Sequence, residues 1–331
     1  MSESRTCERT IPSEGPRALP YCAYPSARDV AHHGLQELPK VLPLVDFVQA
    51  RPHRSAQHKM IPATRLVPAQ VLEMARVVAT AFVRRNPISR HLQPPKHPPA
   101  GLMGARHTDP FGHDMFGPWT METIHYWSIR LRLLTDPTSR QSAIRVNEEV
   151  LGQSLAIVNQ AGEVLGGAFN KPTPPLDAAH AFRQGDLFMT AVVSCLEPAR
   201  ILFNTQNTDA MEALCTQFPA FRDAYARGKV GHHALVARAN ALATEEAFEL
   251  LAATMEHYQA LGYAYVVIAA SHQWTGAACE VLGGVRVHFA PFQAQKTIRE
   301  SVEPLEGTVT SPNGFLSNKD SGSMFYVIRL T

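Results

Sequence analysis

The segment VVIAASHQWTGAACEVLGGVRV (Val266–Val287) decides the fold that we expect for this chain. It begins with a short, continuous apolar run that stops at Ser271, which is typical of a buried strand. An Ala-rich stretch follows, and Gly283–Gly284 end it before another β-rich run. The segment therefore predicts a strand, a short helix and a second strand. The helix carries one cysteine, Cys279, among alanines.

The same alternation extends through the C-terminal third of the chain. Upstream, HHALVARA (232–239) reads as a strand, and TEEAFELLAATMEHYQALG (244–262) reads as an amphipathic helix between a Thr cap and a Gly. Downstream, GSMFYVIRL (322–330) is the last expected strand. Strands that alternate with helices predict a parallel or mixed sheet covered by helices.

Two helices and a hairpin precede this alternation. Helical spacing of apolar residues covers 68–86 and 121–134. The hairpin SLAIVNQAGEVLGGAFN (154–170) contains Gly166–Gly167, which indicates a bulge or a close backbone approach. The pattern also predicts a short edge strand over 64–69 and one helix over 207–229.

The first part of the chain differs in composition from the rest. Residues 1–60 are rich in Pro, His, Ser and Arg, and we expect an extension that wraps the core or is partly mobile. Residues 61–331 form one expected domain. Within it, residues 93–120 are dense in Pro, Gly and His and predict a long loop, ordered or mobile, of a length that is often functional.

Composition excludes several classes of protein. The 331 residues carry a formal net charge of +2 with the cations spread out, so nucleic acid is not an expected partner. No signal peptide and no apolar run of about 18 residues occur, so we expect a soluble cytoplasmic protein without a membrane partner. The five cysteines include no C-x-x-C pair, which favours a reducing compartment. Motifs of serine hydrolases, P-loop NTPases and Rossmann dehydrogenases are absent.

The stretch EHYQALGYAYVVIAASHQWTGAACEVLGGVRV (Glu256–Val287) resembles the GCN5-related N-acetyltransferase (GNAT) superfamily. Members typically read A-x-x-x-G, then a buried strand, then N-x-x-A-x-x-L-Y-x-x-L-G-F. On that pattern His272 takes the place of Asn and Cys279 that of Tyr. The resemblance covers about residues 62–330. It implies an α/β fold with a mixed, mostly antiparallel central sheet flanked by helices, and transfer of an acyl group from a thioester to an amine of a small molecule.

The resemblance also implies a donor site between the strands 231–238 and 263–271. There the arm of an acyl-CoA pairs with free backbone groups as an extra strand would, and the next helix points its first N–H groups at the pyrophosphate. Backbone N–H groups near Val236–Arg238 would stabilise the oxyanion. The implied donor-binding residues are Val236, Ala237, Arg238, Asn240, Ala243, Thr244, His272 and Thr275.

The expected phosphate loop departs from the superfamily pattern. Members usually carry a basic, Gly-rich loop here, whereas ANALATEEAF (Ala239–Phe248) has no Gly and places Glu245 and Glu246 near the phosphate. Arg238 could supply positive charge instead. The expected donor is acetyl-CoA or another acyl-CoA, or an acyl carrier protein, whose phosphopantetheine has one phosphate. The alternative is a catalytically silent fold that binds a ligand or a protein partner.

Three residues are candidates for proton transfer. Cys279 stands where the superfamily commonly has the Tyr that protonates the leaving thiolate, and the alternative is a small core residue. His232 and His233 lie at the start of the strand that precedes the expected phosphate loop, with one facing each side of the sheet. An imidazole suits the general base that deprotonates the amine. The alternatives are a solvent-exposed strand end for these histidines and a helix cap for His272.

The segment 86–127 is the expected acceptor side. Its long loop and following helix would form the lid and wall of a pocket for a small amine. The histidines there fit no metal-ligand frame, so no metal is expected. The sequence leaves the oligomeric state open. The candidate acceptor-binding residues are His107, His113, Trp119, Tyr126 and Trp127.

Overall fold

The described part of the chain forms one mixed β-sheet with helices packed on it. The computed structural model describes residues 58–85, 120–133, 148–173, 210–238, 244–291 and 322–330. Within these ranges the strand order is β1-β2-β3-β4-β5-β7-β6, and β4–β5 is the parallel pair among antiparallel neighbours. The predicted fold class is confirmed. The strands are β1 (His58–Pro62), β2 (Leu155–Asn159), β3 (Val164–Pro172), β4 (Val230–Arg238), β5 (Tyr265–Ala270), β6 (Val285–Pro291) and β7 (Gly322–Arg329).

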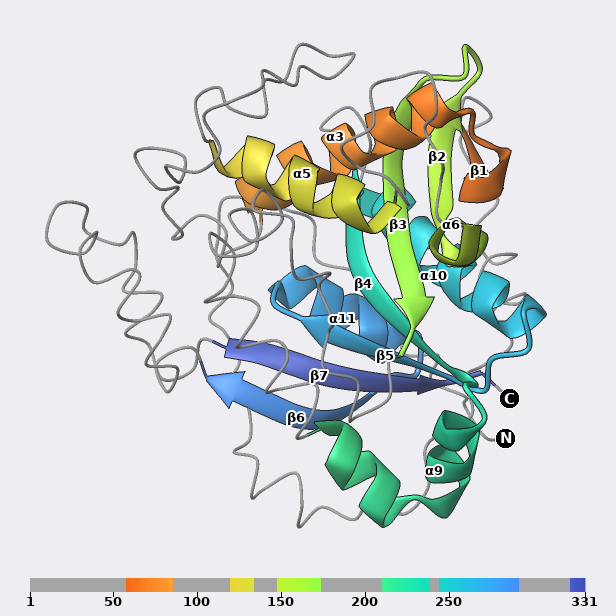
Figure 1. Cartoon of the computed structure of the whole chain (residues 1–331). Coiled ribbons are helices and arrows are strands. Elements are labelled where there is room, and N and C mark those ends of the chain that lie inside the picture. Colours follow the sequence, from red (N-terminus) through yellow and green to blue (C-terminus); the bar gives the residue numbers. More distant parts are fainter. Residues whose placement is uncertain are drawn as a thin grey trace, which may run out of the picture.

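Helices cover both sides of this sheet (Figure 1). The Gly167 backbone of β3 lies against Met74 of α3, and the Gly231 backbone of β4 lies against Tyr258 of α10. These two contacts identify an α3 side and an α10 side of the sheet. The described helices are α3 (Pro68–Arg85), α5 (Met121–Leu133), α6 (Glu148–Gln153), α9 (Pro219–Ala226), α10 (Thr244–Ala260) and α11 (Gln273–Val281).

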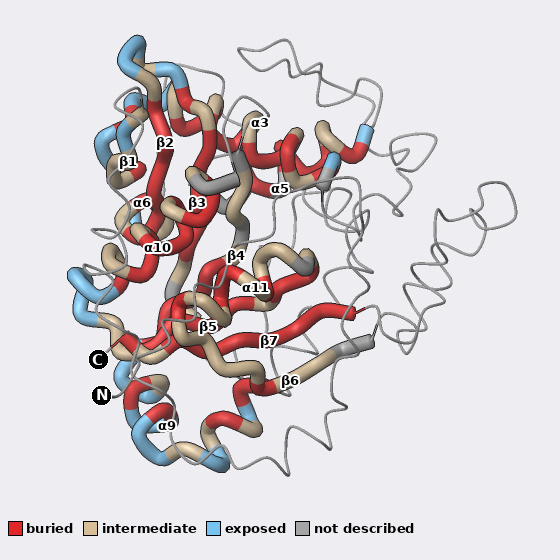
Figure 2. Tube along the Cα trace, turned by 180° about the vertical axis from the view of Figure 1, so that it is seen from behind, coloured by how far each residue is buried: buried red, intermediate tan, exposed pale blue. Residues whose placement is uncertain are grey.

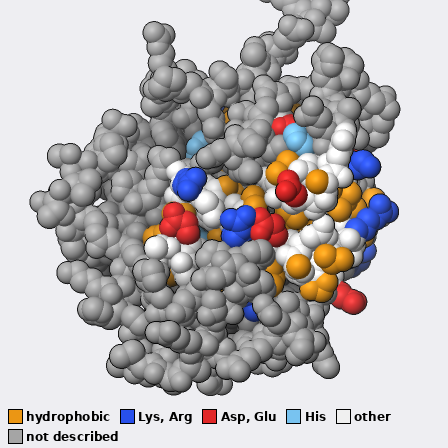
Figure 3. Space-filling model, turned by 90° about the horizontal axis from the view of Figure 1, so that it is seen from above, with side chains coloured by type: hydrophobic (Ala, Val, Ile, Leu, Met, Phe, Trp, Pro, Cys, Tyr) orange, Lys and Arg blue, Asp and Glu red, His pale blue; other side chains and the backbone are white. Residues whose placement is uncertain are grey.

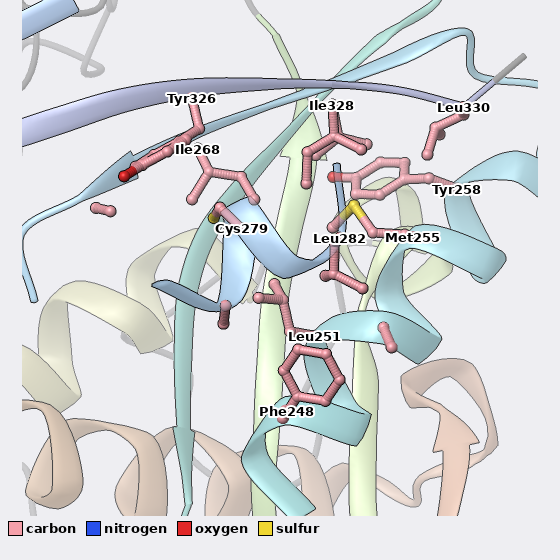
Figure 4. Close-up of a cluster of buried hydrophobic side chains, with 14 of the residues drawn as sticks. Phe248, Leu251, Met255, Tyr258, Ile268, Cys279, Leu282, Tyr326, Ile328 and Leu330 are labelled. Carbon is pink, nitrogen blue, oxygen red and sulfur yellow. The ribbon is translucent and has the colours of Figure 1, made fainter. Parts of the chain in front are cut away.

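Each side of the sheet has its own hydrophobic cluster. On the α10 side, Phe248, Met255 and Tyr258 of α10 and Leu282 after α11 pack on the inward residues of β5 and β7 (Figure 4). On the other side, α9 and the helical segment at 210–217 pack on the alternate residues of the same strands. Figure 2 shows that the strands between these two layers are largely buried. The two faces of the central strands are therefore chemically separate environments.

The first strand differs from the prediction. We expected an edge strand over 64–69, but β1 spans His58–Pro62 and pairs with β2, and Ala63–Arg65 form a 3-10 turn. The sheet thus begins before residue 61, the expected start of the domain. Pro68 explains the shift, since proline lacks the N–H of a paired strand but suits the first turn of α3.

The helix predicted over 207–229 is two helices. A helical segment at 210–217 ends before Phe218, and Pro219 starts α9. Proline cannot continue the backbone hydrogen bonds of a helix interior, but it is well placed at a first helical position. The hairpin prediction is confirmed, and so is the close approach at Gly167, whose backbone touches the Met74 side chain.

No described helix combines the length and the apolar character that a membrane crossing needs. Of the N-terminal extension expected over 1–60, residues 1–57 lie outside the described residues.

Candidate functional site

The pairing between β4 and β5 ends partway along β4. Val230–His233 pair with Tyr265–Ile268, and β4 then continues to Arg238 with β3 as its partner. Opposite Phe169 and Asn170, β4 holds one extra residue, Ala234. Such a bulge bends a strand and increases its twist, and β4 and β5 run in different directions beyond the paired part (Figure 1). The stretch from Ala234 to Arg238 is therefore a strand edge without pairing to β5. It coincides with the expected donor site.

The two histidines of β4 point to opposite sides of the sheet, as predicted. Gly231 faces Tyr258 of α10, so His233, two residues further, faces the α10 side as well. Val230 belongs to the cluster around α9, so His232 faces the opposite side. Lys171 pairs with His232, and it stands four residues after Gly167, which faces α3. His232 therefore faces the side on which α3 and α9 lie.

His233 is held by Asn170, its cross-strand neighbour on β3. The imidazole Nδ1 lies 2.7 Å from Asn170 Oδ1, and Asn170 Nδ2 donates to the Gln153 carbonyl at 2.7 Å. A carbonyl only accepts, so Nδ2 must face Gln153 and Oδ1 must accept from the His233 Nδ1–H. The ring is 3% exposed, and burial lowers its pKa to about 4. His233 is therefore a neutral imidazole with its lone pair on Nε2.

The His233 Nε2 atom is buried and has no hydrogen-bond partner among the described residues. Nearly all buried polar atoms in proteins have a hydrogen-bond partner. The unpaired Nε2 acceptor at the end of this strand pairing therefore calls for an explanation. It lies at the last β4 residue that pairs with β5, directly before the bulge.

Tyr258 fixes the strands just before the opening. Its hydroxyl lies 3.0 Å from the His232 carbonyl of β4 and 3.1 Å from the Lys171 carbonyl of β3, so it donates to this pair of acceptors. Burial raises the pKa of Tyr258, which keeps the hydroxyl a donor. The Tyr258 ring passes where a side chain at 231 would start, because a Cβ there would be 2.4 Å from Cε1. Gly231 is therefore required by the tyrosine that holds β3 and β4 together.

The first turn of α11 is capped by His272. Its Nδ1 accepts from the Trp274 N–H at 3.1 Å, which is the capping role that we considered as the alternative to phosphate binding. Thr275 follows in the same turn and is half-buried. Later in α11, Glu280 accepts from the Tyr326 hydroxyl at 3.1 Å and from Arg286 Nε at 2.9 Å. These contacts attach α11 to β6 and β7.

Cys279 lies inside the hydrophobic cluster on the α10 side of the sheet. The side chain is fully buried between α11 and the strands β5 and β7, near Ile268 and Leu282 (Figure 4). Burial, with a further contribution from Glu280, raises the pKa of the thiol above its ordinary value. These surroundings favour the core interpretation of Cys279 over proton transfer.

One of the two carboxylates that we expected near the phosphate, in the first turn of α10, contacts a histidine of β1. The Glu246 carboxylate contacts Nδ1 of His58 on β1, and both side chains are largely buried. This carboxylate is therefore directed to the edge strand. Thr244 is the first residue of α10, as predicted, but its side chain and that of Glu245 lie outside the described part.

The expected acceptor residues of α5 are buried side by side. Tyr126 and Trp127 are 2% and 3% exposed, and their rings meet edge to face at 5.6 Å between centroids. The buried Arg130 guanidinium donates to the Tyr126 hydroxyl at 3.2 Å and lies 4.6 Å from the centre of the Trp127 ring. α5 packs on α3, so this group is on the same side of the sheet as His232.

Several predicted site residues cannot be placed. His107, His113, Trp119, Asn240 and Ala243 lie outside the described residues, as does the side chain of Arg238. Val236 and Ala237 are half-buried on the unpaired part of β4. Within the described ranges, no three metal-ligating side chains come together. The described part of the surface in Figure 3 carries side chains of both charges.

Sequence reasoning missed Asn170 and Tyr258. Asn170 ends the predicted hairpin as a polar residue directly after an apolar run, and that contrast is the one local signal of its role. Tyr258 lies in the buried stripe of α10, where an aromatic residue looks like ordinary core. Both roles depend on contacts between distant parts of the chain.

No model of a protein family matches the chain, and no curated protein sequence does. Three solved structures illustrate what it is similar to. Mosquito arylalkylamine N-acetyltransferase like 5b is 12% identical (82% of this chain, 100% of that chain, TM-score 0.45). Arylalkylamine N-acetyltransferase 2 from Aedes aegypti is 11% identical (83% and 99%, TM-score 0.43). The C-terminal condensation domain of Ebony, in complex with beta-alanyl-dopamine, is 9% identical (83% and 99%, TM-score 0.43). These three are GNAT-fold proteins.

Proposed function

We propose that this chain is an acyltransferase that moves an acyl group from a thioester donor to an amine of a small molecule. The observation that carries the proposal is the end of the β4–β5 ladder at His233 and Ile268, followed by the Ala234 bulge. The backbone of β4 beyond this point can pair with an extended arm that contains amides, as strands pair with added peptides. The donor is an acyl-CoA or an acyl carrier protein, both of which present such an arm.

The residues around the opening fit this donor. Val236 and Ala237 of β4 would pair with the arm, and the first N–H groups of α10 would face its phosphate. Contact of Glu246 with His58 directs one of the two expected carboxylates toward β1, which weakens the objection to a phosphate at this helix. When bound, the thioester supplies an activated acyl carbonyl.

His232 is the proposed general base. It faces the side of the sheet on which α3 and α9 lie, and α5 with Tyr126 and Trp127 packs on α3, whereas His233 faces the α10 side. An imidazole that takes a proton from the amine as its nitrogen attacks the carbonyl fits the usual role of histidine. The C–N bond forms, the C–S bond breaks, and the proton lost by the amine ends on the thiol product. Cys279 has no assigned part in this scheme.

Thermal-shift titration and a thiol-release assay together test the proposal. We expect acetyl-CoA and free CoA to raise the melting temperature in a concentration-dependent way. We also expect release of free thiol from acetyl-CoA only in the presence of an amine. The first amines to try are arylalkylamines and agmatine, which the names of similar structures suggest.

Each outcome of these assays has a distinct meaning. Stabilisation by CoA without turnover on any amine would support the catalytically silent fold instead. Without stabilisation by any CoA compound, the carrier-protein donor is tested by incubating acyl carrier protein with the chain and an amine. Loss of the acyl mass from the carrier would then support transfer, and an unchanged carrier would contradict the proposed function.

A further inference from the structure

We propose that His233 and Asn170 form a recognition site for an amide N–H in the arm of the donor. This inference rests on the proposed function and adds a contact that uses a side chain rather than the backbone of β4. His233 Nε2 accepts the hydrogen bond, and Asn170 is the positioning residue that orients the ring. The site lies on the α10 side of the sheet, at the last residue of the β4–β5 ladder.

The hydrogen bonds around Asn170 dictate which nitrogen of His233 is free. Asn170 Nδ2 donates to the Gln153 carbonyl, and the Asn170 backbone N–H donates to Ser154 Oγ at 3.2 Å. Ser154 Oγ in turn donates to the Val150 carbonyl at 2.7 Å. The amide of Asn170 is thus fixed from α6, and its Oδ1 can only accept from His233 Nδ1–H. The acceptor lone pair of the ring must be on Nε2.

The neutral charge and the burial of the His233 ring indicate which class of ligand its Nε2 lone pair would accept. The ring is neutral near pH 7, because burial lowers its pKa to about 4, so it does not attract phosphate or carboxylate. A neutral acceptor in a buried place suits a neutral donor such as a secondary amide N–H. The phosphopantetheine arm of CoA and of acyl carrier proteins carries secondary amides. The position before the Ala234 bulge places the acceptor where the strands separate.

The first experiment pairs two variants with two donors. We would measure kcat/KM with acetyl-CoA and with the acetyl thioester of 2-mercaptoethanol, which contains no amide. His233→Leu removes the acceptor, and we expect about a tenfold loss with acetyl-CoA and less than a twofold change with the amide-free thioester. His233→Gln keeps an acceptor oxygen near the position of Nε2, and we expect it to recover most of the loss.

Two results of this experiment would overturn the inference while leaving the proposed function in place. One is an equal loss with both donors, and the other is no loss with either. Both would mean that Nε2 meets only a buried water or core atoms. Absence of turnover by the unmodified chain with every donor and amine would count against the proposed function itself.

A second measurement uses the unmodified chain and does not depend on a variant that folds. Histidine ¹⁵N NMR should show His233 as the Nδ1–H tautomer, and acetyl-CoA should shift its Nε2 resonance. Adenosine 3′,5′-bisphosphate, which lacks the arm, should leave that resonance unchanged. Asn170→Leu removes the acceptor of the Nδ1–H, so it should allow the other tautomer of His233 and weaken acetyl-CoA binding. If the His233 Nε2 resonance does not shift at a saturating concentration of acetyl-CoA, the inference is refuted.

Discussion

His232 and His233 are neighbours in the chain, but they lie in two different environments. His233 faces α10, is held at Nδ1 by Asn170 and is 3% exposed. His232 faces the opposite side, is 9% exposed, and has its backbone carbonyl rather than its ring held by Tyr258. His233 therefore has its ring held by a strand partner on the α10 side, whereas His232 has its backbone held by Tyr258 and its ring on the side where α3 and α9 lie.

Under the proposed function, this difference would let one strand serve two substrates. Alternation along β4 sends consecutive residues to opposite sides, so a donor and an acceptor can be met by adjacent positions. The side of α10 carries the fixed, neutral ring, which suits recognition. The α3 side carries the ring for which we propose proton transfer. Changes to one side should therefore leave the other nearly unaffected.

The strongest contrast is expected in catalysis. His232→Gln should lower kcat/KM by about 100- to 10,000-fold, because general bases contribute this much to proton transfer. The melting temperature should change little, since Tyr258 contacts the backbone of this residue. Steady-state assays with acetyl-CoA and the best amine would measure the loss. His288→Gln on the distant strand β6 is the matched control. Equal activity in both variants would remove His232 from the mechanism.

The next contrast concerns stability against pH. His233 titrates near 6.5 in the unfolded chain and near pH 4 in the folded one. Between these values the unfolded state binds more protons, so the free energy of unfolding rises with pH through this window. Above about pH 6.5 the neutral His233 ring takes nothing from the free energy of unfolding. As the pH falls from there through 4, the free energy of unfolding drops by about 3 kcal/mol.

Urea denaturation between pH 4 and 7.5 would measure this slope. His233→Leu should flatten it, whereas His288→Gln should not. Since carboxylates also titrate in the range, the difference between variant and unmodified chain is the informative quantity. A slope that survives His233→Leu unchanged would show that this ring is not the buried neutral group.

The amino-acid sequence predicts the C-terminal elements well because their signals are local. α10 starts at the expected Thr244 and ends before Gly262, and α11 ends before Gly283–Gly284. β1 was misplaced because its position is set by pairing with β2, almost a hundred residues later, and not by a local pattern.

The candidate site was only half predictable for the same reason. Periodicity is enough to place His232 and His233 on opposite faces. The contact between Asn170 and His233 joins residues 63 positions apart and depends on a register that the Ala234 bulge shifts. Burial of Cys279 follows from how α11 rotates against β5 and β7, which the Ala-rich composition of this helix leaves undetermined.

A third contrast compares two glycines, one on each side of the sheet. Gly231→Ala would place Cβ 2.4 Å from the Tyr258 ring, which is fixed by its hydrogen bonds. Gly167→Ala would place Cβ 2.3 Å from Met74 Cε, the flexible end of a side chain. We expect a loss of about 2 to 3 kcal/mol for Gly231→Ala and clearly less for Gly167→Ala. Chemical denaturation of both variants decides this, and a reversed order would mean that Tyr258 moves more easily than Met74.

The smallest effect is expected at Cys279. The thiol fills space in the cluster on the α10 side, so Cys279→Ala should lower the free energy of unfolding by about 1 kcal/mol. Cys279→Ser should cost more, because it buries a hydroxyl in an apolar site. Cys215→Ala, at a half-buried thiol in the other cluster, is the matched control and should change stability less.

Turnover separates this packing role from the superfamily's proton donor. If Cys279 only fills the core, Cys279→Ala should keep kcat within about twofold of the unmodified chain at a temperature where both are folded. A general acid would lose far more, since proton transfer contributes about 100-fold or more. A loss of that size with unchanged donor affinity would return Cys279 to the mechanism. It would also require the thiol, buried between α11 and β5, to be reached by a donor on the same side as His233.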